Sequence, residues 1–353
     1  MVFAGGGTGG HVYPALAVAQ ALARRHPGLE VIFIGTGSPF EKRVVEGHGF
    51  RLMKVESGGF LGRGLGAKVS ALLRTGMGLV QSLRILWTLK PQAVVGVGGF
   101  ASGPVVGAAI LLRVPTMIQE QNYAPGLANR ILSRWVDRIA VAFEETRDLL
   151  GGRGEVTGNP IREEFTAVKP KPRGTPFCVL VFGGSQGAHA VNQAMIDALP
   201  ALAAHRLALR FTHMTGEKDR ERVEAAYRAE RLDARVVSYL ENMAQEYEKA
   251  DLVVSRAGAT TVSELTACQK AAILIPYPHA AADHQRQNAE KLEQSGAARV
   301  LPESELSGPR LATEIVTLLQ NPDRLTAMER AAAKLARPDA TIRVAELVEE
   351  LMA

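Results

Sequence analysis

Short apolar runs alternate with amphipathic stretches along the whole chain. Runs of three to five mostly apolar residues are typical of buried parallel strands, and the polar and apolar positions between them repeat with the period of a helix. The predicted strands are residues 31–34, 93–97, 116–118, 138–141, 178–182, 208–212, 252–255 and 272–275, and predicted helices include 15–25, 191–204, 220–230 and 261–267. This alternation predicts an α/β protein with parallel sheets that helices cover on both faces.

The pattern breaks once, near the middle of the chain. Residues 168–176 read V-K-P-K-P-R-G-T-P, and the three prolines are typical of a stiff, exposed linker. After it, the order of strand, glycine loop and helix with which the chain begins starts again. We therefore expect two Rossmann-like, doubly wound domains that face each other across a cleft, at residues 1–160 and 161–338. Residues 339–353 are expected to form a C-terminal helix, with packing back on the N-terminal domain as one option.

Composition places the chain among globular proteins, and the charge narrows its partners. Of 353 residues, 46% are hydrophobic and 22% are charged, which excludes disorder and a coiled coil. The net charge is +5, but residues 1–140 carry a basic surplus of nine and the remainder a small acidic surplus. A basic half suits nucleic acid, anionic lipid or a phosphorylated substrate. Because only 5% of residues are aromatic and no nucleic-acid motif is present, we expect no nucleic-acid partner.

Cysteine content and hydropathy indicate in which cellular compartment the protein is expected and whether it spans a membrane. Cys178 and Cys268 are too few for a disulfide framework and form no zinc pattern, so a reducing, cytoplasmic setting is expected. Because the first residues form an apolar strand and a glycine loop, no secretory signal is expected. Its longest apolar stretch, residues 99–112, is interrupted by Gly103 and Pro104 and is too short to span a bilayer.

Three glycine-rich loops follow predicted strands, at residues 5–10, 96–104 and 183–187. Such loops let backbone N–H groups approach a phosphate at a helix N-terminus. The first loop matches G-x-G-x-x-G, which raises a nicotinamide-dependent oxidoreductase as a rival hypothesis. However, no acid follows the strand at 31–34 before Glu41, so a ribose-binding carboxylate is missing at the expected place. The nucleotide-triphosphate P-loop pattern is absent from the chain.

Residues 255–265, S-R-A-G-A-T-T-V-S-E-L, follow a predicted strand and open a helix. Small residues, hydroxyl groups and backbone N–H groups suit a diphosphate there. Glu264 lies one turn into the helix, where its carboxylate could accept both hydroxyls of a ribose. The alternative is an acidic residue that only stabilises the start of the helix.

With these motifs in order, the chain resembles the MurG family of bacterial cell-wall glycosyltransferases, which have the two-domain GT-B fold. The motifs that carry the resemblance are G-G-T-G-G-H at 6–11, G-G…S-G-P at 98–104, E-Q-N at 120–122, G-N-P-I-R at 158–162, G-G-S-Q-G-A at 183–188, the segment 255–264, and D-H-Q at 283–285 with N-A at 288–289. The resemblance implies an inverting hexosyltransferase that moves N-acetylglucosamine (GlcNAc) from UDP-GlcNAc to O4 of the N-acetylmuramic acid (MurNAc) of lipid I. Lipid I is undecaprenyl-pyrophosphoryl-MurNAc-pentapeptide, and the product is lipid II of peptidoglycan biosynthesis.

The resemblance also implies roles for particular residues. Thr8, Gly9 and Gly10 would line the donor diphosphate and sugar, and Asn122 would contact GlcNAc. Arg162 would support the uracil, for which Leu240 would offer backbone groups. The remaining implied donor contacts are Ser185 on a phosphate, Ala259, Thr260, Thr261, Val262 and Ser263 on the phosphates, Glu264 on the ribose and Gln285 on sugar hydroxyls.

The catalytic base stays open between His11 and Glu120, with Glu41 less favoured. Imidazole suits proton transfer near neutral pH, and Glu120 would face the cleft after a buried strand. No Asp-x-Asp occurs in the chain, so the usual acidic metal clamp is missing. We therefore expect no obligatory metal or cofactor, with helix N-termini stabilising the diphosphate charge.

Membrane contact is expected at the basic N-terminal half. The flexible, apolar and basic loop at 58–65 and the basic surplus favour a peripheral protein on the anionic, cytoplasmic face of the cell membrane. For the helical stretch 72–87 alone, the interpretation is an ordinary core-facing helix with solvated arginines. Alternative functions are another UDP-sugar enzyme of GT-B fold (a diacylglycerol glycosyltransferase or a UDP-GlcNAc epimerase) and a non-catalytic UDP-GlcNAc-binding module.

Overall fold

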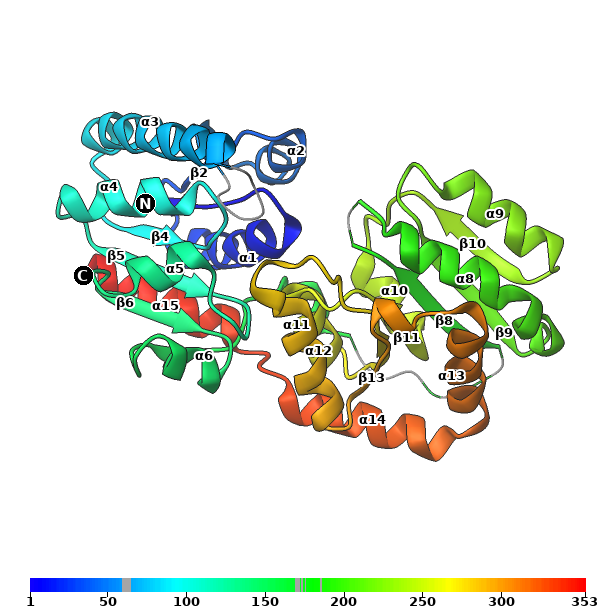
Figure 1. The fold of residues 1–353 in the computed structure, drawn as a ribbon. Coiled ribbons are helices and arrows are strands. Elements are labelled where there is room, and N and C mark those ends of the chain that lie inside the picture. The colour runs from blue at the N-terminus through cyan, green and yellow to red at the C-terminus, as the bar shows by residue number, and fades with distance from the viewer. Residues whose placement is uncertain (59–64, 169–171, 173, 175, 185) are drawn as a thin grey trace. The chain divides into compact units, whose positions relative to one another are not determined.

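The computed structural model of the protein describes residues 1–58, 65–168, 172, 174, 176–184 and 186–353, and of 65–69 only the backbone. The chain divides into two compact units, shown in Figure 1. Unit 1 comprises residues 1–162 and 337–353, and unit 2 comprises residues 163–336. The C-terminal segment thus belongs to the first unit, although the whole second unit precedes it in sequence.

Unit 1 is built on a parallel sheet with the strand order β3-β2-β1-β4-β5-β6-β7. Its strands are β1 (Val2–Ala4), β2 (Ile32–Gly35), β3 (Arg51–Lys54), β4 (Val94–Gly96), β5 (Thr116–Glu120), β6 (Arg138–Val141) and β7 (Glu155–Val156). The chain moves outward from β1 in one direction through β2 and β3, and in the other from β4 onward. The boundary between β1 and β4 is therefore the point at which the direction of winding reverses.

Helices cover both faces of this sheet, as the alternation of apolar runs predicts (Figure 1). They are α1 (Gly9–Arg25), α2 (Pro39–Gly47), α3 (Leu65–Leu89), α4 (Ser102–Leu111), α5 (Leu127–Leu132), α6 (Glu144–Leu149) and α15 (Ala340–Met352). Phe3 and Phe33 point to one face, where they share a core with α1, α2 and α15. Val2 and Ile34 point to the other, where they pack against α3, α4 and α5. Successive strand residues thus supply two separate cores.

Unit 2 repeats the plan with a parallel sheet of order β10-β9-β8-β11-β12-β13. The strands are β8 (Phe177–Phe182), β9 (Leu209–Met214), β10 (Asp233–Val237), β11 (Leu252–Ser255), β12 (Ala271–Leu274) and β13 (Ala298–Val300). The helices are α7 (Glu163–Thr166), α8 (His189–Leu202), α9 (Arg220–Ala229), α10 (Met243–Lys249), α11 (Ala259–Ala267), α12 (His284–Gln294), α13 (Gly308–Gln320) and α14 (Pro322–Leu335), with 3-10 turns at η1 (Ala203–His205), η2 (Ala281–Asp283) and η3 (Glu303–Glu305). Here the winding reverses between β8 and β11.

Helix α15 packs on unit 1 through an apolar face and through ion pairs. Val344 and Val348 lie in the core that α1 forms with the sheet. Glu349 accepts from the side chains of Arg25 and His26 at the end of α1. At the start of α15, Thr341 donates its hydroxyl to the carbonyl of Ile161 and accepts from the N–H of the same residue. The last helix and the end of the N-terminal segment are thereby joined.

No helix within the described ranges is both long enough and apolar enough to cross a bilayer.

Candidate functional site

Both units place glycine-rich loops at the reversal of their winding, which is where doubly wound sheets bind ligands. In unit 1 the loops after β1 and β4 lie side by side, because Ala4 pairs with Gly96. In unit 2 the loops after β8 and β11 are neighbours, because Phe182 pairs with Ser255. Each unit therefore offers backbone N–H groups and a helix N-terminus at the carboxyl edge of its sheet.

The two glycine loops of unit 1 pack backbone against backbone. A Cβ atom on Gly5 would lie 2.4 Å from the carbonyl oxygen of Gly98, and one on Gly99 would lie 2.3 Å from that of Gly6. Gly5, Gly98 and Gly99 also have positive φ angles, which L side chains rarely adopt. Any side chain at these positions would push the loops apart, so glycine is required by space as well as by conformation.

Glu41 holds the first glycine loop to the loop after β2. Glu41 is 1% exposed and lies in the first turn of α2, where it forms a capping box with Ser38. The carboxylate accepts from the N–H groups of Gly7 and Gly37 and from the Thr36 hydroxyl, the last two at 2.7 and 2.9 Å. A Cβ on Gly6 would lie 2.3 Å from its Oε1 atom. From the sequence alone, Glu41 is a less favoured candidate for the catalytic base. In the structure its carboxylate anchors the first glycine loop.

His11 lies in the first turn of α1, directly after the first glycine loop. Its Nδ1 atom is 3.1 Å from the Thr8 hydroxyl, and its ring faces the second glycine loop. A Cβ on Gly98 would lie 3.0 Å from Nε2 of the imidazole. Thr8 is exposed, whereas Gly9, Gly10 and His11 are half-buried. The predicted residues Thr8 to His11 thus form one edge of the site, where the His11 imidazole lies between Thr8 and Gly98.

Glu120 ends β5 and is 2% exposed. Its carboxylate accepts from the backbone and side-chain nitrogens of Asn122 at 3.0 and 3.1 Å, from the Gly126 N–H at 2.9 Å and from the Asn129 side chain at 2.9 Å. Four donors use the ordinary acceptor capacity of a carboxylate. This arrangement favours an anchoring role for Glu120 in the loop before α5 over proton transfer, and it orients Asn122.

Arg162 is placed with unit 1, whereas the predicted boundary put it in the second domain. Its guanidinium carbon lies 4.7 Å from the centroid of the Tyr13 ring on α1, a cation–π geometry. Tyr13 in turn packs beside Gly9, whose Cβ would come within 3.2 Å of the ring. Arg162 is therefore close to the first turn of α1.

In unit 2, the loop after β8 is held against the end of β9. A Cβ on Gly187 would lie 2.0 Å from the carbonyl oxygen of Thr215, and one on Gly216 would lie 2.4 Å from that of Gln186. The N–H of Gly187 closes the turn by donating to Gly184 at 2.9 Å. Ser185, the predicted phosphate contact in this loop, lies outside the described residues.

The start of α11 carries the predicted diphosphate segment. Ala259, Thr260 and Val262 are buried, and the Ser263 hydroxyl donates to the Ala259 carbonyl at 3.0 Å, so its proton is already used. Glu264 is buried beside Tyr247, whose hydroxyl lies 3.5 Å from its Oε2 atom. The first N–H groups of this nine-residue helix point along its axis, where an α-helix attracts anions.

Gln285 and Arg256 join the loops that follow β11 and β12. The Gln285 Oε1 atom accepts from the N–H groups of Ala257 and Tyr277 at 3.3 and 3.0 Å, so a sugar hydroxyl would meet its amide nitrogen. Arg256 is 8% exposed and donates to the carbonyls of Ile275 and Pro276, both at 3.1 Å. It also pairs with Glu303 at 2.6 Å. Sequence reasoning missed Arg256, although a charge directly after a buried strand was an available signal.

Leu240 is buried, and its backbone N–H donates to the Met214 sulfur at 3.2 Å. Thioether sulfur is a weak acceptor, so a uracil oxygen would be a stronger partner for this N–H group. Among the described residues, no group of three or more His, Cys, Asp or Glu side chains has metal-binding geometry.

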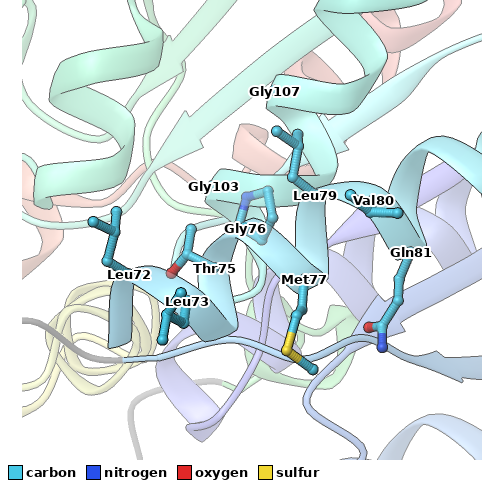
Figure 2. A pocket seen from close by; sticks show the side chains of 11 residues that line it. Leu72, Leu73, Thr75, Gly76, Met77, Leu79, Val80, Gln81, Gly103 and Gly107 are labelled. Carbon is cyan, nitrogen blue, oxygen red and sulfur yellow. The ribbon is translucent and has the colours of Figure 1, made fainter. Parts of the chain in front are cut away.

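Helix α3 faces the core on one side, as predicted, but its other side is exposed. Leu86 is buried in the core with α4 and the sheet, but five large apolar side chains are exposed in the part of α3 whose side chains are described. These are Leu72, Leu73, Met77, Val80 and Trp87, which we call the α3 surface. Between α3 and α4 the surface hollows into an apolar groove of about 880 Å³ (Figure 2). It is lined by the α3 surface except Trp87, and by Leu79, Gly103 and Gly107.

Behind the β8 loop, His213 is fully buried on β9. Burial lowers its pKa to about 3, while the nearby Asp219 carboxylate acts in the opposite direction. In the unfolded chain a histidine titrates near 6.5, so below that pH the unfolded state binds the extra proton. The stability due to neutral His213 is therefore complete above pH 6.5 and is lost as the pH falls towards 3.

We expect His213 to give unit 2 a pH-dependent stability. Between pH 7 and pH 5 the free energy of opening β9 should fall by about 2 kcal/mol more in the wild type than in His213→Gln. Hydrogen exchange of the β9 amides, corrected for intrinsic rates, measures this difference. Parallel pH dependences in the two proteins would contradict the expectation.

Comparison with known proteins matches both units to one family. Family models described as the N-terminal and C-terminal domains of glycosyltransferase family 28 match residues 1–141 and 178–344. A protein of Syntrophus aciditrophicus named UDP-N-acetylglucosamine–N-acetylmuramyl-(pentapeptide) pyrophosphoryl-undecaprenol N-acetylglucosamine transferase is 47% identical, covering 95% of this chain and 94% of its own. One of the same name from Anaeromyxobacter sp. (strain Fw109-5) is 47% identical, covering 100% and 93%.

A solved structure agrees with these sequence relatives. The crystal structure of MurG from Acinetobacter baumannii superposes with a TM-score of 0.79 at 32% identity, covering 99% of this chain and 98% of its own.

Proposed function

The chain belongs to glycosyltransferase family 28, and from that premise we propose that it transfers GlcNAc from UDP-GlcNAc to O4 of the MurNAc of lipid I, giving lipid II for peptidoglycan. It has the GT-B fold, with two Rossmann-like domains. The observation that carries the proposal is 47% identity, over nearly the whole chain, to transferases named for this reaction. Glycine loops at the reversal point of each sheet support it, because both substrates carry a diphosphate.

The reaction that we propose is a single in-line displacement. O4 of the acceptor forms a bond to C1 of GlcNAc as the bond between C1 and the diphosphate oxygen breaks, and the electron pair leaves with UDP. An α-linked donor then gives a β-1,4 linkage. The N-termini of α8 and α11, each directly after a loop of unit 2, meet the charge that develops on the diphosphate. We propose that no obligatory metal or cofactor is needed.

His11 is the base in this proposal. In the tautomer that donates from Nδ1 to the Thr8 hydroxyl oxygen, Nε2 carries the lone pair that takes the O4 proton. The saturated carboxylates of Glu120 and Glu41 support this choice, because neither retains an ordinary acceptor position. Asn122, oriented by Glu120, would contact the acetamido sugar.

The deciding experiment is transfer of labelled GlcNAc from UDP-GlcNAc to a short-chain lipid I analogue, with and without EDTA. Transfer that survives EDTA supports both the reaction and its independence of metal. Tight donor binding without transfer would overturn the lipid I assignment. Epimerised donor or free sugar, formed without any acceptor, would identify an epimerase instead, and equal use of UDP-glucose would point to another UDP-sugar transferase.

We further propose that unit 1 binds peripherally to the anionic, cytoplasmic face of the cell membrane. The α3 surface exposes apolar side chains, with Trp87 71% exposed, and the exposed Arg74 and Arg84 lie on the same helix. Apolar side chains next to basic ones are typical of helices that lie in a membrane interface. The acceptor is itself anchored in the bilayer by its undecaprenyl chain.

The α3 surface predicts the strength of membrane binding. We expect Leu73→Ser, Met77→Ser and Trp87→Ser together to weaken binding to vesicles with anionic lipid by about tenfold or more, since each buried apolar side chain contributes about 1.5–3 kcal/mol. Co-sedimentation measures this. Leu207→Ser, at an 89% exposed site of unit 2, is the matched control and should leave binding unchanged. If the triple variant and the control bind the vesicles equally well, α3 is not the membrane-binding surface.

A further inference from the structure

A chain of hydrogen bonds runs behind the β8 loop, through side chains that the proposed reaction does not use. Asn192, in the first turn of α8, and His213, on β9, are both fully buried. The His213 Nε2 atom lies 3.1 Å from Asn192 Oδ1, and its Nδ1 atom lies 3.3 Å from the hydroxyl of the buried Tyr227 on α9. Asn192 Nδ2 donates to the Thr215 carbonyl and to Asp219 Oδ2, both at 2.9 Å.

The partners determine the orientation of every group in this chain. Asn192 Nδ2 faces a carbonyl and a carboxylate, so the reverse orientation of the amide would place oxygen against oxygen twice. Asn192 Oδ1 must then accept, which requires a proton on His213 Nε2. The lone pair of His213 Nδ1 is left for the Tyr227 hydroxyl. All donors run in one direction, from Tyr227 to the Thr215 carbonyl, when the imidazole is neutral.

The Thr215 carbonyl, the last acceptor in this series of hydrogen bonds, also packs against the loop that follows β8. A Cβ on Gly187 would lie 2.0 Å from that oxygen, and one on the neighbouring Gly216 would lie 2.4 Å from the Gln186 carbonyl oxygen. Asn192 belongs to the helix that the loop enters. One side chain therefore holds together the end of β9 and the start of α8, the two supports of the loop. Asp219, which also accepts from His189 and Arg222, ties the start of α9 to the same point.

We propose that Asn192 and His213 are positioning residues for donor binding: they hold Gln186 and Gly187, at the end of the loop after β8, in the position that receives the donor's diphosphate. The inference rests on the proposed function, because it takes UDP-GlcNAc as the ligand of this loop. Neither side chain touches the ligand in this proposal. Their effect is to keep the Thr215 carbonyl against Gly187, so that the backbone of the loop does not have to be ordered when UDP binds.

The test compares UDP with uridine, which lacks the diphosphate, in calorimetric titrations of the full-length protein. Asn192→Leu and His213→Phe should weaken UDP binding by about tenfold or more and leave uridine binding within about twofold of wild type. His213→Gln retains an amide N–H that can reach Asn192 and should restore most of the UDP affinity. Ile315→Ala, which leaves a cavity in the apolar core of unit 2 and removes no hydrogen-bonding group, is the control for general destabilisation.

The outcomes separate this inference from the proposed function. Loss of UDP affinity alone, with rescue by His213→Gln, supports it. Equal losses for UDP and uridine, or a matching loss in Ile315→Ala, would mean a merely structural role and overturn it. Unchanged UDP affinity in both Asn192→Leu and His213→Phe would overturn it as well, while leaving the transferase proposal intact. A wild-type protein that binds neither UDP nor UDP-GlcNAc would overturn the proposed function itself.

Discussion

Replacing His11 by alanine is expected to lower kcat for GlcNAc transfer by about 10²-fold or more, while the affinity for UDP-GlcNAc stays within about threefold of wild type. The expectation follows from position, because the imidazole lies in the first turn of α1 against Gly98 of the second glycine loop. Removing a base acts on the transition state, in which the O4 proton is in transfer, and leaves donor binding nearly as it was.

Two further observations make this prediction specific to proton transfer. Exogenous imidazole should restore part of the activity of His11→Ala, because a free base can enter the space of the missing ring. Thr8→Val, which removes only the hydroxyl beside Nδ1, should cost about tenfold, as expected for a partner that orients the ring. If His11→Ala keeps more than about a tenth of the wild-type kcat, the base must be sought elsewhere.

Replacing Glu41 by alanine is expected to lower the free energy of unfolding of unit 1 by about 2–4 kcal/mol. The carboxylate accepts from Gly7 in the loop after β1 and from Thr36 and Gly37 in the loop after β2, and alanine would leave these donors without their acceptor. Gly7 is exposed and Gly37 half-buried, so water can satisfy part of the lost hydrogen bonding, and the loss of stability is smaller than for a fully buried anion. Hydrogen exchange of the β1 and β2 amides measures the effect.

Glu46 offers a matched control for Glu41. It lies on the same helix, α2, but is exposed, so Glu46→Ala should change stability by less than about 0.5 kcal/mol. Glu41→Gln, which keeps the shape but has one acceptor oxygen, should fall between the two. Because the anchored loop leads into α1, we also expect Glu41→Ala to lower kcat. Equal stability of Glu41→Ala and Glu46→Ala would contradict the anchoring role.

The strands that sequence patterns predicted are those at the centre of each sheet. Central strands such as β4 and β11 are buried on both faces and therefore read as continuous apolar runs. The patterns missed the edge strands β3 and β10, with sequences R-L-M-K and D-A-R-V-V, because the exposed edge of a sheet admits charged residues. The edge strands β7 and β13 were missed as well.

Helix α3 shows a second limit of periodicity. Its apolar residues were interpreted as core-facing, which holds for the side that carries Leu86. On the other side, Leu73, Met77 and Trp87 are exposed. An amphipathic pattern indicates that one face of a helix is apolar. It does not distinguish packing against the protein core from contact with a surface outside the chain.

For the site, the sequence by itself determined the chemistry that is local in the chain. Glycine loops, the helix that follows each one and His11 beside Thr8 are consequences of adjacent residues, and they are sufficient for the family resemblance. The tertiary structure decided which groups meet over long sequence separations. Glu41 meets Gly7, and Asn192 meets His213, only because the parallel sheets bring the ends of neighbouring strands to one edge. The reason is that hydrogen-bond capacity is a property of the folded surroundings: a carboxylate looks like a base in sequence, and four donors in space make it an anchor.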